Sequence, residues 1–133
     1  MRVLALPRDP NPYQRLLYEA CARYGMRVRY VGDLTRSHTL NLLLLPLELA
    51  VWRARGWDTL HVHWVFGFRL PGAGRVPGVA RLSELWYRAV LALAQWLGLR
   101  LVWTAHNTLP HEPVFEDDVA ARRTLVGASD LVV

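Results

Sequence analysis

Short apolar runs alternate with longer amphipathic stretches along the chain, and this alternation restricts the fold more than any other feature of the sequence. The apolar runs cover residues 2–6, 26–31, 59–66 and 100–105, and a fifth begins at residue 130. The stretches between them repeat apolar residues at helical spacing. Strands that alternate with helices of this length are joined by right-handed crossovers and form a parallel sheet. We therefore predict an α/β protein, a Rossmann-like doubly wound parallel sheet of about five strands in three α/β/α layers, with residues 1–133 as a single domain.

The helices are expected to turn their apolar stripes toward this sheet. Asn11 and Pro12 form a good start for the first helix, and Gly25 a good end. Its stripe comprises Tyr13, Leu16, Leu17, Ala20, Cys21 and Tyr24. The third helix, at residues 82–97, carries a similar stripe: Leu82, Leu85, Trp86, Ala89, Val90, Leu93, Trp96 and Leu97. The last helix is expected from Glu116 to Val126, with Glu116, Asp117 and Asp118 in its first turn, where the helix dipole favours acidic residues.

The second helical segment, at residues 40–52, is apolar on nearly every side and contains Pro46. Two interpretations stay open, an internal helix and a helix that lies against a membrane surface. The segment is too short to span a bilayer, which takes about 20 apolar residues.

Composition restricts the chemistry and the location. The single cysteine excludes an internal disulfide framework and a cysteine-based zinc cluster. No long uncharged apolar run and no signal peptide is evident, so a cytoplasmic protein is expected. The net charge is +5, and the 14 arginines of residues 1–100 face only 6 acidic residues. Such a basic body suits nucleic acid, anionic lipid or a nucleotide diphosphate.

Polar side chains follow the strands at the edge where ligands bind. In doubly wound sheets this is the edge formed by the carboxyl ends of the strands. His106 and Asn107 end the fourth apolar run, and His111 and Glu112 follow within six residues. An imidazole and an amide can hold a hydroxyl or phosphate oxygen, and a carboxylate can orient an imidazole or accept a proton. A structural role in the core or in a solvated loop remains the alternative for each of them.

His61 and His63 lie two residues apart on one strand, so their side chains share one face of the sheet. With His106 they are candidates for a metal site, although a histidine in a covered sheet is more often a hydrogen-bonded core residue. Trp64 either packs or offers its ring to a sugar. The chain has no G-x-G-x-x-G, Walker or G-x-S-x-G motif, so the usual signs of a dehydrogenase, nucleotidase or hydrolase are missing.

Four segments occur in a telling order: NPYQRLLYEACARYGMRV, DTLHVHW, LVWTAHNTLPHE and ASDLVV. Together they resemble the N-terminal domain of GT-B glycosyltransferases, especially glycosyltransferase family 4, and the third segment is the most specific. The resemblance implies two Rossmann-like domains that face each other across a cleft. The N-terminal domain mainly holds the acceptor, and the C-terminal domain holds the nucleotide sugar.

By this resemblance, His106 matches the histidine beside the donor sugar. As a catalytic residue it would hydrogen-bond the sugar, or the charge that develops as the nucleotide diphosphate leaves. Neither a metal nor another cofactor is implied. Substrate-binding roles are expected for Asn11, Tyr13, His63, Trp64, Asn107, His111 and Glu112.

The chain departs from the family pattern in two places. The loop after the first strand, PRDPNPY, lacks the glycine pair that approaches phosphate in many relatives, so Asn11 and the start of the first helix would replace it. The chain also ends at the fifth strand, so a donor-binding domain and its acidic motif lie outside it. Sugar transfer is therefore expected only together with a donor domain, in the same protein or in a partner subunit.

We expect a glycosyltransferase N-terminal domain that binds a sugar or lipid-linked acceptor for polysaccharide biosynthesis. It would act in the cytoplasm, with peripheral contact to the inner face of the plasma membrane. Its partners would be a nucleotide-sugar donor and the acceptor, and no nucleic acid. Two alternatives remain: a basic nucleic-acid-binding module, and a metal-dependent hydrolase built on His61, His63 and His106.

Overall fold

The computed structural model describes residues 1–106 and 114–133 and contains one parallel sheet. Its strand order is β2-β1-β3-β4-β5, and every neighbouring pair is parallel. The strands are β1 (Arg2–Leu6), β2 (Arg27–Tyr30), β3 (Thr59–Val62), β4 (Arg100–Trp103) and β5 (Leu131–Val132). The predicted α/β class and five-stranded parallel sheet are thereby confirmed.

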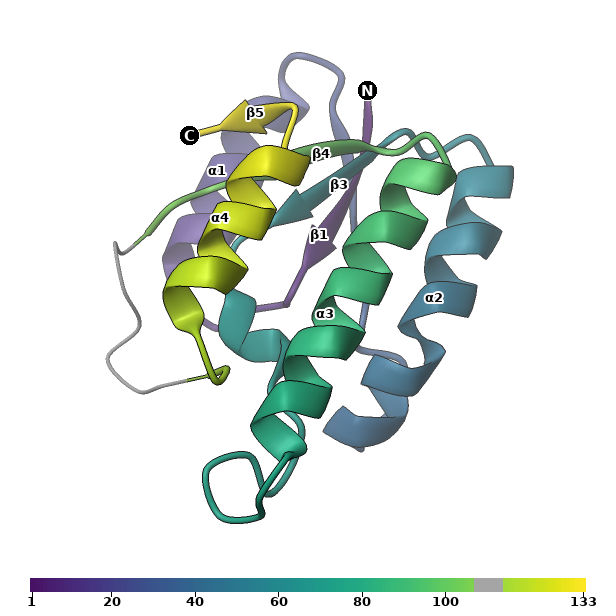
Figure 1. The fold of residues 1–133 in the computed structure, drawn as a ribbon. Helices are drawn as coiled ribbons and strands as arrows, with labels where there is room; N and C mark the ends of the chain where they lie inside the picture. Colours follow the sequence, from purple (N-terminus) through teal and green to yellow (C-terminus); the bar gives the residue numbers. More distant parts are fainter. Residues whose placement is uncertain (107–113) are drawn as a thin grey trace.

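The helices cover the two faces of the sheet unequally. They are α1 (Pro12–Ala22), α2 (His38–Ala54), α3 (Val79–Trp96) and α4 (Asp118–Ala128). Figure 1 shows α2, α3 and α4 in front of the sheet and α1 behind it. This division follows from the strand order, because the step from β1 to β2 runs in the opposite direction to the later steps and right-handed crossovers then place the helices on opposite faces.

The face covered by three helices contains the main core. Alternate strand residues point toward it, including Leu4 and Leu6 of β1, Leu60 and Val62 of β3, and Leu101 of β4. The α1 face has a much smaller apolar cluster, in which Val3 and Ala5 pack against Tyr18. Apolar burial therefore stabilises mainly one face of the sheet.

Several element boundaries differ from the prediction by a few residues, and two of these differences have a clear physical reason. The run at residues 59–66 is a strand only as far as Val62, and a short 3-10 helix, η1 (Val65–Phe68), follows. A turn is needed there because Val65 and Phe68, three residues apart, both enter the main core. Helix α4 begins at Asp118, since Asp117 caps it by accepting a hydrogen bond from the Ala120 N–H.

The predicted apolar stripes of α1 and α3 were wrong in part. Helix α1 buries Gln14 and Tyr18, whereas Leu16 is exposed and Tyr24 is 91 % exposed. Gln14 can be buried because its amide accepts a hydrogen bond from the Asp9 N–H and donates one to the Pro7 carbonyl.

Helix α3 shows the same rotation of its buried face. Ser83 is buried, accepts a hydrogen bond from the Leu70 N–H and donates one to the Val79 carbonyl, while Leu82, Leu85 and Trp96 are exposed. Satisfied polar groups thus occupy inward positions that the apolar pattern assigned to other residues.

Helix α2 has one side buried in the protein and one side exposed. Leu42, Leu45 and Leu49 are buried in the main core. The opposite side exposes a row of four apolar side chains: Leu40, Leu43, Leu47 and Val51. Within the part of the chain that the structure describes, no helix combines the length and apolar character that crossing a membrane requires.

Candidate functional site

His106 lies beyond the carboxyl end of β4, on the α1 side of the sheet. Its ring contacts those of Trp64 and Tyr13, and these three side chains are called the aromatic nest below. Its half-buried imidazole stacks on Trp64, with ring centroids 4.0 Å apart and an interplanar angle of 17°. The ring of Tyr13 stands edge-on to it at 4.9 Å. Trp64 follows β3 and Tyr13 belongs to the first turn of α1, so three segments meet at this edge of the sheet.

A continuous chain of hydrogen bonds runs from His106 into the interior. His63 Nδ1 is 3.3 Å from His106 Nε2, and His63 Nε2 is 2.6 Å from the Tyr18 hydroxyl. The same hydroxyl is 3.0 Å from His61 Nδ1, and His61 Nε2 is 2.8 Å from Thr104 Oγ1. Strand β3 and the residue that follows it place His61 and His63 on the α1 face, and α1 places Tyr18 between the two imidazoles. These five side chains are called the histidine–tyrosine chain below.

Burial makes the histidines of this chain weak bases. Desolvation, followed by the proximity of His106, lowers the pKa of His61 to about 4. Desolvation, followed by the proximity of His61 and His106, lowers the pKa of His63 to about 3. Burial also lowers the pKa of His106, against a smaller opposing effect of Asp9. All three imidazoles are therefore neutral at pH 7.

Tyr18 is held in its protonated form as well. Burial, followed by the proximity of Tyr30, Cys21 and Tyr13, raises the pKa of its phenol far above the ordinary value. The histidine–tyrosine chain is thus an uncharged hydrogen-bond network in a buried region of low dielectric constant, where satisfied hydrogen bonds are strong.

The structure brings three of the predicted binding residues to His106. Tyr13 and Trp64 touch its ring, and His63 lies beneath it with only 1 % of its surface exposed. His63 is therefore too buried to contact a ligand directly and would act on one only through its hydrogen bond to His106. The indole of Trp64 also lies against Phe66, at 5.5 Å between centroids, so its first role is to support the imidazole.

The other predicted residues fall into two groups. Asn11 is the N-cap of α1, and its side chain accepts a hydrogen bond from the Tyr13 N–H. That bond fixes the turn that carries Tyr13. Asn107, His111 and Glu112 lie outside the described residues.

The ring nitrogens of His61 and His63 are used within the histidine–tyrosine chain, which argues against the metal hypothesis. His61 and His63 each hydrogen-bond through both nitrogens, to Tyr18 and to Thr104 or His106. In the described ranges, 1–106 and 114–133, no group of three or more His, Cys, Asp or Glu residues is arranged to hold a metal ion.

An open pocket of about 700 Å³ adjoins the aromatic nest at the same edge of the sheet. Phe66 connects the two, because it lines the pocket and also contacts Trp64. Arg8, Arg36 and Arg69 give the pocket a basic lining, although Arg8 also forms an ion pair with Asp33 at 3.3 Å. A basic recess of this kind suits a phosphate or another anionic group.

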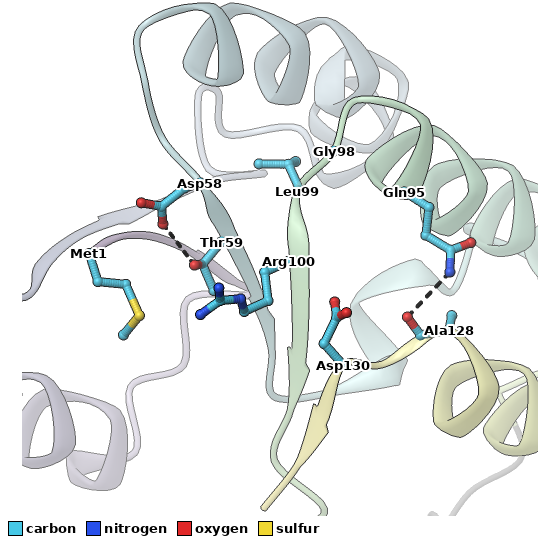
Figure 2. A pocket seen from close by; sticks show the side chains of 9 residues that line it. All are labelled: Met1, Asp58, Thr59, Gln95, Gly98, Leu99, Arg100, Ala128 and Asp130. Carbon is cyan, nitrogen blue, oxygen red and sulfur yellow. Dashed lines mark hydrogen bonds between the residues drawn. The ribbon is translucent and has the colours of Figure 1, made fainter.

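A second pocket, of about 650 Å³, lies at the opposite edge of the sheet. Figure 2 shows Asp58 and Asp130 there, at the amino ends of β3 and β5. Both carboxylates already accept hydrogen bonds, Asp58 from the Arg2 N–H and the Thr59 hydroxyl, and Asp130 from the Leu101 N–H. They join strand ends, so this pocket is a poorer candidate for chemistry than the carboxyl edge.

Sequence reasoning missed Tyr18, Thr104 and the arginines of the basic pocket. Strand register carried a usable signal for Thr104. His61 pairs with Val102, so alternate residues of β4 and its continuation share the face of the histidines. Tyr18 gave no comparable signal, because nothing in the sequence of α1 marks it out from Tyr13, the other aromatic residue of that helix.

The comparisons with known proteins add no relative to this picture. No protein-family model, no curated protein and no solved structure matches the chain.

Proposed function

We propose that the chain is the N-terminal, acceptor-side domain of a GT-B glycosyltransferase, in which His106 contacts the sugar that is transferred. The observation that carries the proposal is the half-buried imidazole of His106, held between Trp64 and Tyr13 at the carboxyl edge of a doubly wound parallel sheet. Ligands of such sheets bind at this edge. The aromatic rings offer apolar surface for a sugar, and the imidazole supplies the polar contact.

The basic pocket supports the same function. Sugar donors carry a diphosphate, and many lipid-linked acceptors carry phosphate as well. Arg8 and Arg36 line a recess that meets the aromatic nest at Phe66, so one ligand could place an anion near the arginines and a sugar near His106.

A transfer assay tests the catalytic part of the proposal. The chain is combined with a donor-binding domain, and sugar transfer from UDP-glucose and GDP-mannose is measured. The expected effect of His106→Ala is a loss of about 100-fold or more in kcat, the size of effect seen when one donor to a developing charge is removed. Equal loss of fold and rate would instead make His106 a structural residue.

A binding assay on the chain alone tests the site independently. Soluble oligosaccharides and the two nucleotide sugars are titrated into 15N-labelled protein, and signals of His106, Tyr13 and the Trp64 indole are expected to shift. A single-stranded RNA is the comparison ligand at low salt. Tight, salt-sensitive RNA binding without any response to sugars would favour the nucleic-acid alternative and contradict the proposal.

The proposal includes a peripheral membrane contact through the exposed apolar row of α2. Leu43 and Leu47 are large, exposed and on one side of the helix, and the net charge of +5 favours an anionic surface. Flotation with phosphatidylglycerol vesicles is expected to recover the protein, and Leu43→Gln with Leu47→Gln to reduce the recovery. Val119→Gln with Val126→Gln on α4 is the matched control, since those two valines are also exposed. Equal recovery of all three proteins, or recovery of none, would contradict the membrane contact.

A further inference from the structure

The histidine–tyrosine chain contains enough hydrogen-bond information to locate its protons. A neutral imidazole has one N–H donor and one acceptor nitrogen, and a hydroxyl has one hydrogen. His61, His63 and His106 are neutral at pH 7, so each must donate on one side and accept on the other. Tyr18 is buried between two of them, and its hydrogen goes to one of its two histidine neighbours. All links then point the same way along the chain, and two directions remain.

In the inward direction, His106 donates from Nε2 to His63 Nδ1, and His63 donates from Nε2 to the Tyr18 oxygen. Tyr18 then donates to His61 Nδ1, and His61 donates from Nε2 to Thr104. The hydroxyl hydrogen of Thr104 then needs an acceptor of its own. Thr104 is only 6 % exposed, and among the described residues its side chain has a single hydrogen-bond partner, His61. This direction leaves a buried hydroxyl hydrogen unsatisfied, which is costly.

In the outward direction, every buried donor has an acceptor. Thr104 donates to His61 Nε2, His61 donates from Nδ1 to the Tyr18 oxygen, and Tyr18 donates to His63 Nε2. His63 then donates from Nδ1 to His106 Nε2, so the proton of His106 must be on Nδ1. The one donor that the chain does not consume is this Nδ1–H, and it belongs to a half-exposed ring at the ligand edge.

We propose that Tyr18 is a positioning residue that, through His63, fixes the ring proton of His106 on Nδ1, so that His106 meets a ligand as a neutral hydrogen-bond donor. Its partner is an oxygen acceptor, such as a hydroxyl, a ring oxygen or a phosphate oxygen. That this oxygen belongs to a sugar nucleotide or an acceptor sugar rests on the proposed function, whereas the position of the proton does not. A ring nitrogen that already carries a proton is unable to act as a general base toward the ligand.

NMR of the histidine rings tests the proposal directly. Protonated and unprotonated ring nitrogens have distinct 15N shifts, and long-range 1H–15N spectra of the 15N-histidine-labelled chain at pH 7.5 assign each one. The expected result is Nδ1–H for His61, His63 and His106, although free histidine in water prefers Nε2–H. A proton on Nε2 of His106 or of His63 in the unmodified protein would overturn the proposal, and this measurement needs no variant.

Two tyrosine variants test the role of Tyr18. In Tyr18→Phe, the histidines lose the hydroxyl that links them, so His63 and His106 are expected to shift toward the Nε2–H form. Tyr30→Phe is the matched control, because the Tyr30 ring packs edge-on against Tyr18 at 6.2 Å and lies outside the chain. Folded Tyr18→Phe protein with unchanged tautomers would overturn the positioning role.

The tautomer measurement also separates this inference from the proposed function. If no sugar or nucleotide sugar shifts the His106 signals while all three histidines show Nδ1–H, the proposed function fails and the proton assignment stands. If sugars bind at a His106 that carries its proton on Nε2, the reverse holds.

Discussion

The two faces of the sheet divide stability and chemistry between them. The face under α2, α3 and α4 buries a large apolar core in which Leu60, Phe68 and Leu101 are fully enclosed. On the α1 face, the buried cluster of the described residues consists of Val3, Ala5 and Tyr18, and Tyr18 belongs to the polar chain that ends at His106. Because a buried polar network stabilises only when every member is satisfied, the molecule confines it to the face that contributes less apolar burial. The comparison shows how a small domain can hold a neutral histidine network without sacrificing its main core.

The largest change in stability is expected from a substitution on the face that contains the main core. Phe68→Ala opens a cavity in the main core and should lower the free energy of unfolding by about 3–5 kcal/mol in urea denaturation. Phe66→Ala is the matched control two residues away, since Phe66 is 50 % exposed, and it should cost far less. Similar losses in the two variants would break the assignment of stability to this face.

A slightly smaller effect is expected from acid on the polar face. The folded pKa of His61 is about 4 and the unfolded value is about 6.5, so the unfolded chain binds more protons between these pH values. The contribution of neutral His61 to the free energy of unfolding is therefore fully present above pH 6.5. It is lost as the pH decreases, and the loss from His61 alone reaches roughly 3 kcal/mol at pH 4.

Urea denaturation at pH 7.5 and pH 4 measures this loss. His61→Gln should reduce the difference between the two pH values, while His38→Gln, at an exposed histidine of α2, should retain it. A pH dependence that is identical in the two variants would show that the buried histidines are not its source.

Removing one hydroxyl from the polar face should have a moderate effect. Tyr18→Phe leaves two buried imidazole nitrogens without their shared partner and should lower the free energy of unfolding by about 1–3 kcal/mol. Tyr24→Phe, at a tyrosine that is almost fully exposed, should leave stability unchanged. If Tyr18→Phe is as stable as Tyr24→Phe, the buried polar chain contributes little to the fold.

The smallest effect on stability is expected at the ligand edge. His106→Ala removes a half-buried ring from its stack on Trp64 and lets water replace that ring as the partner of His63 Nδ1, so it should change the free energy of unfolding by about 1 kcal/mol or less. Thermal unfolding followed by circular dichroism measures the change. A loss comparable with that of Phe68→Ala would place His106 in the structural core and remove the distinction between the two faces.

The sequence predicted the sheet well and the helix faces poorly, for physical reasons. Strand runs such as RVLAL and RLVW are largely apolar because both faces of a parallel sheet are covered, so these short continuous runs are easily recognised. Helices α1 and α3 carry apolar residues on more than one side, and their orientation depends on satisfied polar groups such as Gln14 and Ser83. Those hydrogen bonds join residues whose proximity exists only after folding.

The candidate site was partly predictable in the same sense. The position of His106 at the end of an apolar run was enough to place it just beyond the carboxyl end of β4. Its link to Tyr18 was not predictable, because it requires the depth at which α1 packs on β3 as well as the rotation of that helix. The local pattern of a helix sets neither quantity.

The short helix η1 has a consequence for the rates at which backbone amide hydrogens on the two sides of the sheet exchange with solvent. Val65 and Phe68 anchor it in the main core, and Trp64 precedes it directly, so the aromatic support of His106 is attached to the stable half. If α1 detaches transiently, Tyr13 and Tyr18 leave with it, whereas Trp64 keeps its place. Amide hydrogens of α1 should accordingly be replaced by deuterium sooner than those of β3, and the site would lose one wall while the other wall stands.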